Sequence, residues 1–151
     1  MKSLIGEFDC TLDSKGRFIM PTGLRKQIPQ EAGDKFVINR GFEKCLVMYP
    51  FNEWEKISEE INKLNPYVQQ NRDFIRYFFR GAIELTLDAS SRLLLPKRLL
   101  DYAGISKDVV LFAHTNKIEI WSEELYNNIM DSEPENFADL AEKVMGGNLH
   151  I

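Results

Sequence analysis

Two short segments of the sequence place an aspartate four residues before an arginine, with a tight turn expected between them. The first is Asp13-Ser-Lys-Gly-Arg17 and the second is Asp88-Ala-Ser-Ser-Arg92. A guanidinium group is a planar donor fork that fits phosphates and guanine edges, so the arginines favour nucleic-acid binding. For the aspartates, a purely structural role is an equally good interpretation, because each could pair with its arginine or bond the backbone N–H groups of the turn.

Both segments belong to a duplicated stretch of chain. Residues 6–24 and 81–99 match at a shift of 75 positions, with seven of nineteen pairs identical. The match resumes with small loop shifts and ends on residues 46–49 against 118–121. Each copy therefore predicts one unit of strand, turn, strand, short helix, strand and strand. In the first copy the strands are expected at 7–12, 17–20, 36–39 and 45–49, and the short helix from 23 to 27 or 28.

Apolar residues at helical spacing separate and follow the two copies. One helix is expected with Asn52 as its N-cap, and a second with Asn65 as its cap and Pro66 at its first position. Ser122 is expected to cap a helix after the second copy, and a last short helix is expected near 137–144. The chain is therefore predicted to be α+β. The expected parts are repeat 1 at 7–53, a helical connector at 54–81, repeat 2 at 82–125 and an acidic C-terminal helical tail at 126–151.

Charge is distributed unevenly along the sequence. The formal net charge is −4, but residues 122–151 have a balance of −6, whereas residues 1–50 have a balance of +2. Local charge decides what a surface attracts, so the acidic total does not argue against a nucleic-acid partner. The first copy is the more basic one, because Lys15, Arg25 and Lys26 each align with a residue that carries no positive charge.

Other kinds of chemistry find little support in the sequence. The two cysteines lack CxxC spacing, and Cys10 lies in an alternating stretch typical of a buried thiol. His114 and His150 are isolated, and no phosphate-binding loop occurs, so no metal or cofactor is expected. No apolar stretch approaches the ~20 residues of a membrane-spanning helix. Duplicated aspartates could form the catalytic pair of an aspartic protease, in which the two carboxyl groups share a proton. An arginine beside each aspartate would lower the pKa of that carboxyl group and so oppose proton sharing. Catalysis is therefore not expected.

The motifs resemble the MraZ family. The resemblance rests on the first motif with Pro21, the strand end Leu46-Val-Met-Tyr-Pro50 with Trp54, and the second motif with Leu-Leu-Leu-Pro96, and it covers nearly the whole chain. It implies a bacterial transcriptional regulator built from two SpoVT-AbrB-type βαββ repeats, which fold together about a pseudo-two-fold axis in a swapped-hairpin, barrel-like arrangement. It also implies rings of subunits that bind short direct repeats of DNA upstream of the division and cell-wall gene cluster, usually including the regulator's own gene.

One departure from the family pattern concerns the second turn, where Ser90 and Ser91 replace a glycine-containing turn. A base-reading role for that turn is therefore left open. The residues expected to bind DNA are Lys15 and Arg17, with Arg25, Lys26 and Arg92 in secondary roles. The residues expected to shape the turns are Asp13, Gly16 and Asp88.

The expected protein is a cytoplasmic, nucleoid-associated regulator without enzymatic activity. Its expected partners are double-stranded DNA and further copies of itself, with no membrane, cofactor or small-molecule substrate. The alternative is a ring-forming scaffold that binds only protein. That alternative explains the apolar helices between the two copies, but it leaves Lys15 and Arg17 without a role.

Overall fold

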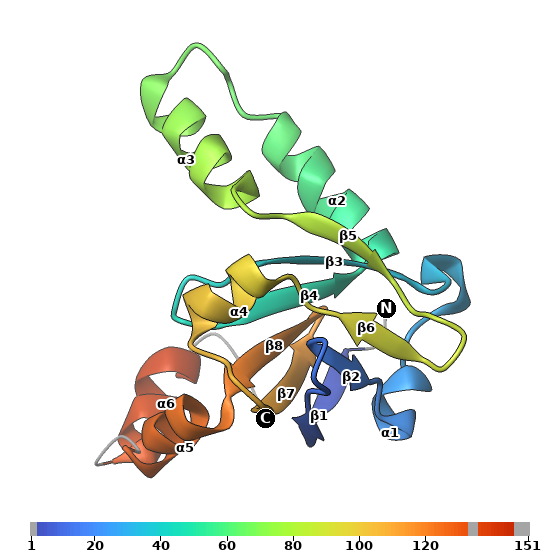
Figure 1. The fold of residues 1–151 in the computed structure, drawn as a ribbon. Coiled ribbons are helices and arrows are strands. Elements are labelled where there is room, and N and C mark those ends of the chain that lie inside the picture. The colour runs from blue at the N-terminus through green and yellow to red at the C-terminus, as the bar shows by residue number, and fades with distance from the viewer. Residues whose placement is uncertain (1–2, 133–135, 147–151) are drawn as a thin grey trace.

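The computed structural model describes residues 3–132 and 136–146 and shows an α+β protein (Figure 1). The strands are β1 (Leu4–Thr11), β2 (Arg17–Ile19), β3 (Lys35–Arg40), β4 (Leu46–Pro50), β5 (Ile83–Thr86), β6 (Arg92–Leu94), β7 (Asp108–Thr115) and β8 (Lys117–Ser122). The helices are α1 (Thr22–Arg25), α2 (Phe51–Asn62), α3 (Gln69–Phe79), α4 (Lys97–Ala103), α5 (Glu123–Asp131) and α6 (Phe137–Met145), and a short 3₁₀ helix, η1 (Gln30–Ala32), precedes β3. The predicted unit of strand, turn, strand, short helix, strand and strand is thus present twice.

The two repeats exchange strands. The larger sheet has six strands in the order β1-β7-β8-β4-β3-β5, and β2 pairs with β6 in a separate antiparallel ribbon. The first strand of each repeat, β1 or β5, therefore pairs with the third strand of the other repeat, β7 or β3. Neither repeat can build the larger sheet alone, which agrees with the few short strands that each one supplies.

The pairing registers define a pseudo-two-fold axis. In the ribbon, Phe18 lies opposite Leu93, its own equivalent in the second copy. At the centre of the larger sheet, Val47 lies opposite Glu119, which are also equivalent positions. An axis that passes through both pairs relates the two copies, so the two candidate turns lie at equivalent places around it.

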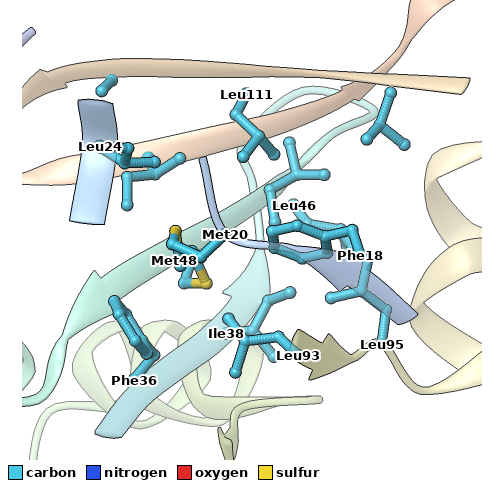
Figure 2. Close-up of a cluster of buried hydrophobic side chains, with 14 of the residues drawn as sticks. Phe18, Met20, Leu24, Phe36, Ile38, Leu46, Met48, Leu93, Leu95 and Leu111 are labelled. Carbon is cyan, nitrogen blue, oxygen red and sulfur yellow. The ribbon is translucent and has the colours of Figure 1, made fainter. Parts of the chain in front are cut away.

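The main core fills the space between the ribbon and one face of the larger sheet. Phe18 and Leu93 point from the ribbon toward Ile38, Leu46 and Met48 of the sheet (Figure 2), and all five side chains are at most 1 % exposed. Burying a side chain of this size contributes roughly 1.5–3 kcal/mol. The ribbon is therefore anchored to the fold by its own inward-facing residues.

Helices cover the opposite face of the larger sheet. α2 and α5 follow β4 and β8 directly and pack Trp54, Ile57 and Ile129 against a second apolar cluster on that face. β4 is consequently buried on both faces, which explains its continuous apolar sequence. The α2–α3 and α5–α6 hairpins lie at opposite ends of the molecule (Figure 1). Across residues 3–132 and 136–146, no helix has the length and apolarity needed to cross a membrane.

Two helix starts differ from the expected ones. α2 begins one residue before Asn52, because β4 runs straight into the helix, and the Asn52 side chain does not cap it. α3 begins at Gln69 instead of Pro66. The Asn65 side chain accepts a hydrogen bond from the N–H of Tyr67 at 3.0 Å, so it closes a separate turn ahead of the helix.

Other local expectations can be compared directly with the structure. The Ser122 hydroxyl accepts the N–H of Leu125 at 3.1 Å and caps α5, as predicted, and α6 lies where the last helix was expected. Cys10 is only half-buried, although burial raises the pKa of its thiol to about 11 and keeps it protonated at neutral pH. His150 and parts of the predicted tail, residues 133–135 and 147–151, lie outside the described residues.

Candidate nucleic-acid interface

The carboxylate of Asp13 organises the first candidate turn. Its Oδ1 accepts hydrogen bonds from the backbone N–H groups of Lys15 and Arg17, both at 2.9 Å. Its Oδ2 accepts the Nε–H of Arg17 at 2.7 Å. Gly16 completes the turn with a φ of 85°, in the left-handed region that glycine adopts without strain. Asp13 therefore fixes both the backbone of the turn and the position of the guanidinium group.

The second turn has the same geometry without a glycine. Oδ1 of Asp88 accepts the backbone N–H groups of Ser90 and Arg92, both at 2.9 Å, and Oδ2 accepts the Nε–H of Arg92 at 2.9 Å. Ser91 stands at the position of Gly16 and adopts a φ of 60°. The change from glycine to serine thus preserves the form of the turn, at the expense of some backbone strain.

Hydrogen bonds to each aspartate favour its charged form. The backbone N–H of Arg17 is the largest cause that lowers the pKa of Asp13, from 3.8 to about 2, and the Arg17 guanidinium group adds to this effect. The pKa of Asp88 is lowered in the same way, led by the backbone N–H of Arg92. A lowered pKa is the opposite of what a proton-sharing catalytic pair requires, so the geometry gives no support to acid catalysis at these aspartates.

Both arginines lie on the outward face of the ribbon. Strand alternation turns Arg17, Ile19, Arg92 and Leu94 away from the core. In the register Arg17 and Arg92 are diagonal neighbours, and such positions are roughly 7–8 Å apart. Ile19 is 65 % exposed and Leu94 52 % exposed, so two aliphatic side chains accompany the two cations. Lys15 is exposed in the first turn, at the end of this surface.

The ion pairs engage one nitrogen of each guanidinium group. Nε of Arg17 and Nε of Arg92 bond their aspartates, and no hydrogen bond from their Nη atoms to any residue of 3–132 or 136–146 occurs. The structural and the binding interpretations are therefore compatible. One edge of the guanidinium group stabilises the hairpin, and the other edge can donate to a phosphate or a base.

The other two basic candidates of the first copy differ from each other. Arg25 forms an ion pair with Asp34, with 2.5 Å between Nη2 and Oδ1, so its charge is partly neutralised. Lys26 is exposed at the C-terminal end of α1, and none of the ion pairs among the described residues involves it. Because Arg25 is paired and Lys26 is not, in the part of the chain that the structure describes, Lys26 can add positive charge near the ribbon more effectively than Arg25 can.

Sequence reasoning missed two basic residues of the second copy. Lys97 and Arg98 are exposed at the start of α4, where the first copy has uncharged residues at the equivalent positions of α1. The first copy carries its charges at the end of the short helix and the second at its beginning. The two basic residues follow Pro96 directly in the sequence. An alignment of the two copies position by position, however, showed only that the second copy lacks basic residues at the positions of Arg25 and Lys26.

The ribbon surface combines exposed cations with exposed aliphatic side chains. Within the described ranges, no group of three or more His, Cys, Asp and Glu residues is placed to hold a metal ion. Guanidinium groups fixed on the outward face of a two-stranded ribbon can contact an extended polyanion, because several donors are presented outward at once.

The chain is similar to known proteins along nearly its whole length. The family model described as "MraZ protein, putative antitoxin-like" matches residues 4–76 and again residues 78–146. A protein named "Transcriptional regulator MraZ" from Flavobacterium psychrophilum is 45 % identical over 147 residues, which are 97 % of this chain and 94 % of the relative. Proteins of the same name are 42 % identical in Christiangramia forsetii (98 % of this chain, 96 % of the relative) and 40 % identical in Cytophaga hutchinsonii (93 % of each).

A solution structure of a Pyrococcus horikoshii protein covers 77 % of this chain and 97 % of its own at 21 % identity, but its TM-score of 0.33 is too low to carry an argument. The family resemblance inferred from the Asp–Arg turns is confirmed by the two family matches and by relatives of 40–45 % identity along nearly the whole chain. This chain belongs to the MraZ family.

Proposed function

We propose that this chain is a sequence-specific DNA-binding transcriptional regulator that acts on short direct repeats upstream of the division and cell-wall gene cluster, including its own gene. One observation carries the proposal. Aspartates hold Arg17 and Arg92 on one outward face of the ribbon and engage only the Nε atom of each arginine. The name of the relatives supports a role in transcription. The direct repeats and the gene cluster follow from the family resemblance.

The first copy makes the main contacts with DNA, and the second copy makes secondary ones. Arg17 reads a base edge or a phosphate pair, and Lys15 contacts a phosphate from the exposed turn beside it. Arg92, Arg25 and Lys26 add secondary contacts or long-range attraction. Asp13, Gly16 and Asp88 act on the DNA only indirectly, because they hold the turns in shape.

A single ribbon presents a small patch, so binding by one subunit is expected to be weak and salt-sensitive. Head-to-tail contacts between subunits close into a ring and repeat each ribbon by rotation. Several ribbons that meet successive DNA repeats raise the apparent affinity without any new type of contact. Direct repeats suit this arrangement, whereas a two-fold dimer would require a palindrome.

The fold that supports this function is a pair of SpoVT-AbrB-type repeats, residues 7–53 and 82–125. The connector at 54–81 joins them, and the acidic tail at 126–151 follows. The exchange of β1 and β5 between the repeats supports the swapped-hairpin form of this fold. The protein acts in the cytoplasm at the nucleoid, without enzymatic activity, cofactor or small-molecule substrate.

An electrophoretic shift assay with DNA from upstream of the protein's own gene tests the proposal. The expected result is a retarded complex that survives competition by a scrambled duplex of equal length and weakens as salt is added. A folded protein that retards neither duplex at low salt would refute DNA binding. Light scattering on the same sample distinguishes the DNA-binding regulator from the alternative, a ring-forming scaffold. A large assembly that does not bind DNA is the result expected of the scaffold.

A further inference from the structure

The C-terminal helix α6 exposes an apolar stripe. Phe137, Leu140 and Val144 fall on one side of the helix at positions i, i+3 and i+7, and they are 70 %, 41 % and 67 % exposed. Their counterpart in the first repeat is α3, which follows α2 as α6 follows α5. The stripe of α3 is used within the subunit, because its aromatic residues pack against Trp54 of α2. In the first repeat the rings of Phe78 and Phe79 thus have a partner on α2, whereas Phe74 and Tyr77 of the same helix remain exposed.

An aromatic hollow lies elsewhere on the same subunit. It has a volume of about 170 Å³ and lies between α3, α4 and the loop that joins β3 to β4. Phe42 in that loop is 91 % exposed, and Tyr77 on α3 is 73 % exposed. The second repeat has no such loop, because Asn116 alone separates β7 from β8. We name this surface, formed by Phe42, Phe74, Tyr77, Tyr102, Arg40 and Lys117, the aromatic hollow.

Two cations, Arg40 and Lys117, line the aromatic hollow, and Lys44 lies beside it. Arg40 and Lys44 lie over the ring of Tyr102, with 4.8 and 4.4 Å from the cationic groups to the ring centroid. The Tyr102 hydroxyl donates to the carbonyl oxygens of Gly41 and Glu43 and so ties α4 to the loop. Within the described part of the chain, the buried Nε of Arg40 has no hydrogen-bond partner. An occupant of this surface should therefore combine apolar side chains with negative charge.

The α6 stripe has the required chemistry. It is apolar and belongs to the most acidic part of the chain, since residues 122–151 carry a net charge of −6, whereas residues 63–80, which include α3, carry +3. Pairing of two α6 stripes would bring the two acidic tails together, which is unfavourable. α3, which forms one wall of the aromatic hollow, and α6 belong to hairpins at opposite ends of one subunit (Figure 1).

We infer that α6 of one subunit docks into the aromatic hollow of a second copy of this chain, with the acidic tail against its basic rim. The contact is heterologous, because it joins two different surfaces, and contacts of this kind can close into a ring. The inference rests on the proposed self-assembly and names the two surfaces that produce it. It does not involve the ribbon, so DNA contact by a single subunit is a separate property.

Complementary interface variants test this pairing. Val144→Glu disables the stripe and leaves the aromatic hollow intact, whereas Phe42→Glu disables the aromatic hollow and leaves the stripe intact. Light scattering should report a monomer of 17.5 kDa for each variant alone. An equimolar mixture should form a dimer of twice that mass, because one intact stripe meets one intact hollow and no further subunit can be added.

Matched controls separate this effect from added charge or misfolding. Ala138→Glu adds the same charge to α6 outside the stripe, and Tyr67→Glu changes a 90 % exposed aromatic residue outside the aromatic hollow, so both should assemble as the wild type does. Circular dichroism should show that all four variants are folded. If either interface variant keeps the wild-type mass, or if the two monomers do not dimerise on mixing, the pairing is refuted.

A wild-type protein that is itself monomeric at micromolar concentration would refute both the pairing and the proposed ring. Because a monomer retains its ribbon, an electrophoretic shift assay on that monomer still tests the DNA-binding proposal independently.

Discussion

The turns at Asp13 and Asp88 make the same hydrogen bonds from different residues. In each turn a carboxylate accepts two backbone N–H groups and one Nε–H within 2.7–2.9 Å. Between the aspartate and the arginine, however, the first turn has Lys15 and Gly16 where the second has Ser90 and Ser91. The Asp–Arg geometry is therefore a requirement of the hairpin that both copies retain, whereas the charge of the turn differs between them.

This comparison separates two roles that the Asp–Arg motif combines. If both copies need the motif for the fold, equivalent substitutions should affect stability equally in the two copies. If only the first copy is specialised for DNA, equivalent substitutions should affect DNA binding unequally.

Truncation of the inward-facing ribbon residues should have the largest effect. Phe18→Ala is expected to lower the free energy of unfolding by about 3–5 kcal/mol and Leu93→Ala by about 2–5 kcal/mol, because each leaves a cavity on the pseudo-two-fold axis. Urea unfolding measures both changes. Ile19→Ala on the outward face is the control, with an expected change within about 0.5 kcal/mol. A Phe18→Ala variant as stable as this control would contradict the account.

Removal of either aspartate charge should have the next largest effect and should be similar in the two copies. Asp13→Asn and Asp88→Asn are each expected to lower the melting temperature by several degrees, because the acceptor of two N–H groups and of a guanidinium group is weakened. Calorimetry compares the two variants directly. A large loss for one variant with none for the other would show that the two turns are not structurally equivalent.

The same aspartates give the direction of a pH effect. The folded protein holds Asp13 with a pKa of about 2 against 3.8 in the reference state, so the unfolded chain binds more protons between these values. The stabilisation is fully present above pH 3.8 and is lost as the pH falls toward 2. Urea unfolding across this range should show a steeper loss for the wild type than for the double variant Asp13→Asn, Asp88→Asn. Equal slopes would contradict the assignment.

Exchange of the left-handed residues should have a smaller effect. Gly16→Ser is expected to destabilise by about 1–2 kcal/mol, because a serine would adopt a φ near 85° and its Cβ would lie 3.4 Å from the Leu95 carbonyl oxygen. Ser91→Gly relieves comparable backbone strain but increases the freedom of the unfolded chain, so a gain below about 1 kcal/mol is expected. Urea unfolding gives the sign of the change in the free energy of unfolding. Destabilisation by Ser91→Gly would contradict the inference that Ser91 is strained.

Substitutions of the turn cation should leave stability unchanged and alter only DNA binding. Lys15→Ser is expected to reduce the slope of log affinity against log salt by about 0.9 for each subunit that contacts a phosphate through Lys15. Lys63→Ser, an exposed lysine on the connector, is the control and should leave the slope unchanged. The converse variant, Ser90→Lys, should steepen the slope only if the second turn also reaches the DNA. A wild-type slope for Lys15→Ser would remove this lysine from the interface.

Local features of the fold could be predicted from the sequence. Each Asp–Arg turn lies within five residues of chain. Because the motif occurs in both copies, each copy independently predicted the same turn. The alternation over 7–12 likewise depends only on neighbouring residues, and the structure confirms a strand there. The Ser122 cap was predictable for the same reason, because the hydroxyl bonds an N–H only three residues away.

Long-range features could not be predicted from the residue pattern alone. The alternating pattern of β1 suits pairing within its own repeat as well as the observed pairing with β7, and the exchange was expected only from the family resemblance. The caps expected at Asn52 and Asn65 were wrong, because the direct passage of β4 into α2 and the turn at Tyr67 override residue preference. The exposure of Ile19 and Leu94 follows from the pairing of β2 with β6, which the sequence does not encode locally.

The central claim is that Arg17 contributes to DNA recognition beyond its part in the hairpin. Arg17→Ala tests this claim when affinity for the upstream DNA, melting temperature and particle mass are measured on one preparation, with Arg92→Ala beside it. The ion pair lost in either variant is partly exposed, so each should lose at most about 1 kcal/mol of stability and keep the wild-type mass.

The account predicts that Arg17→Ala loses roughly 1–3 kcal/mol of binding free energy for each engaged subunit, while Arg92→Ala loses less. A folded, fully assembled Arg17→Ala protein that binds the upstream DNA with wild-type affinity would contradict the account.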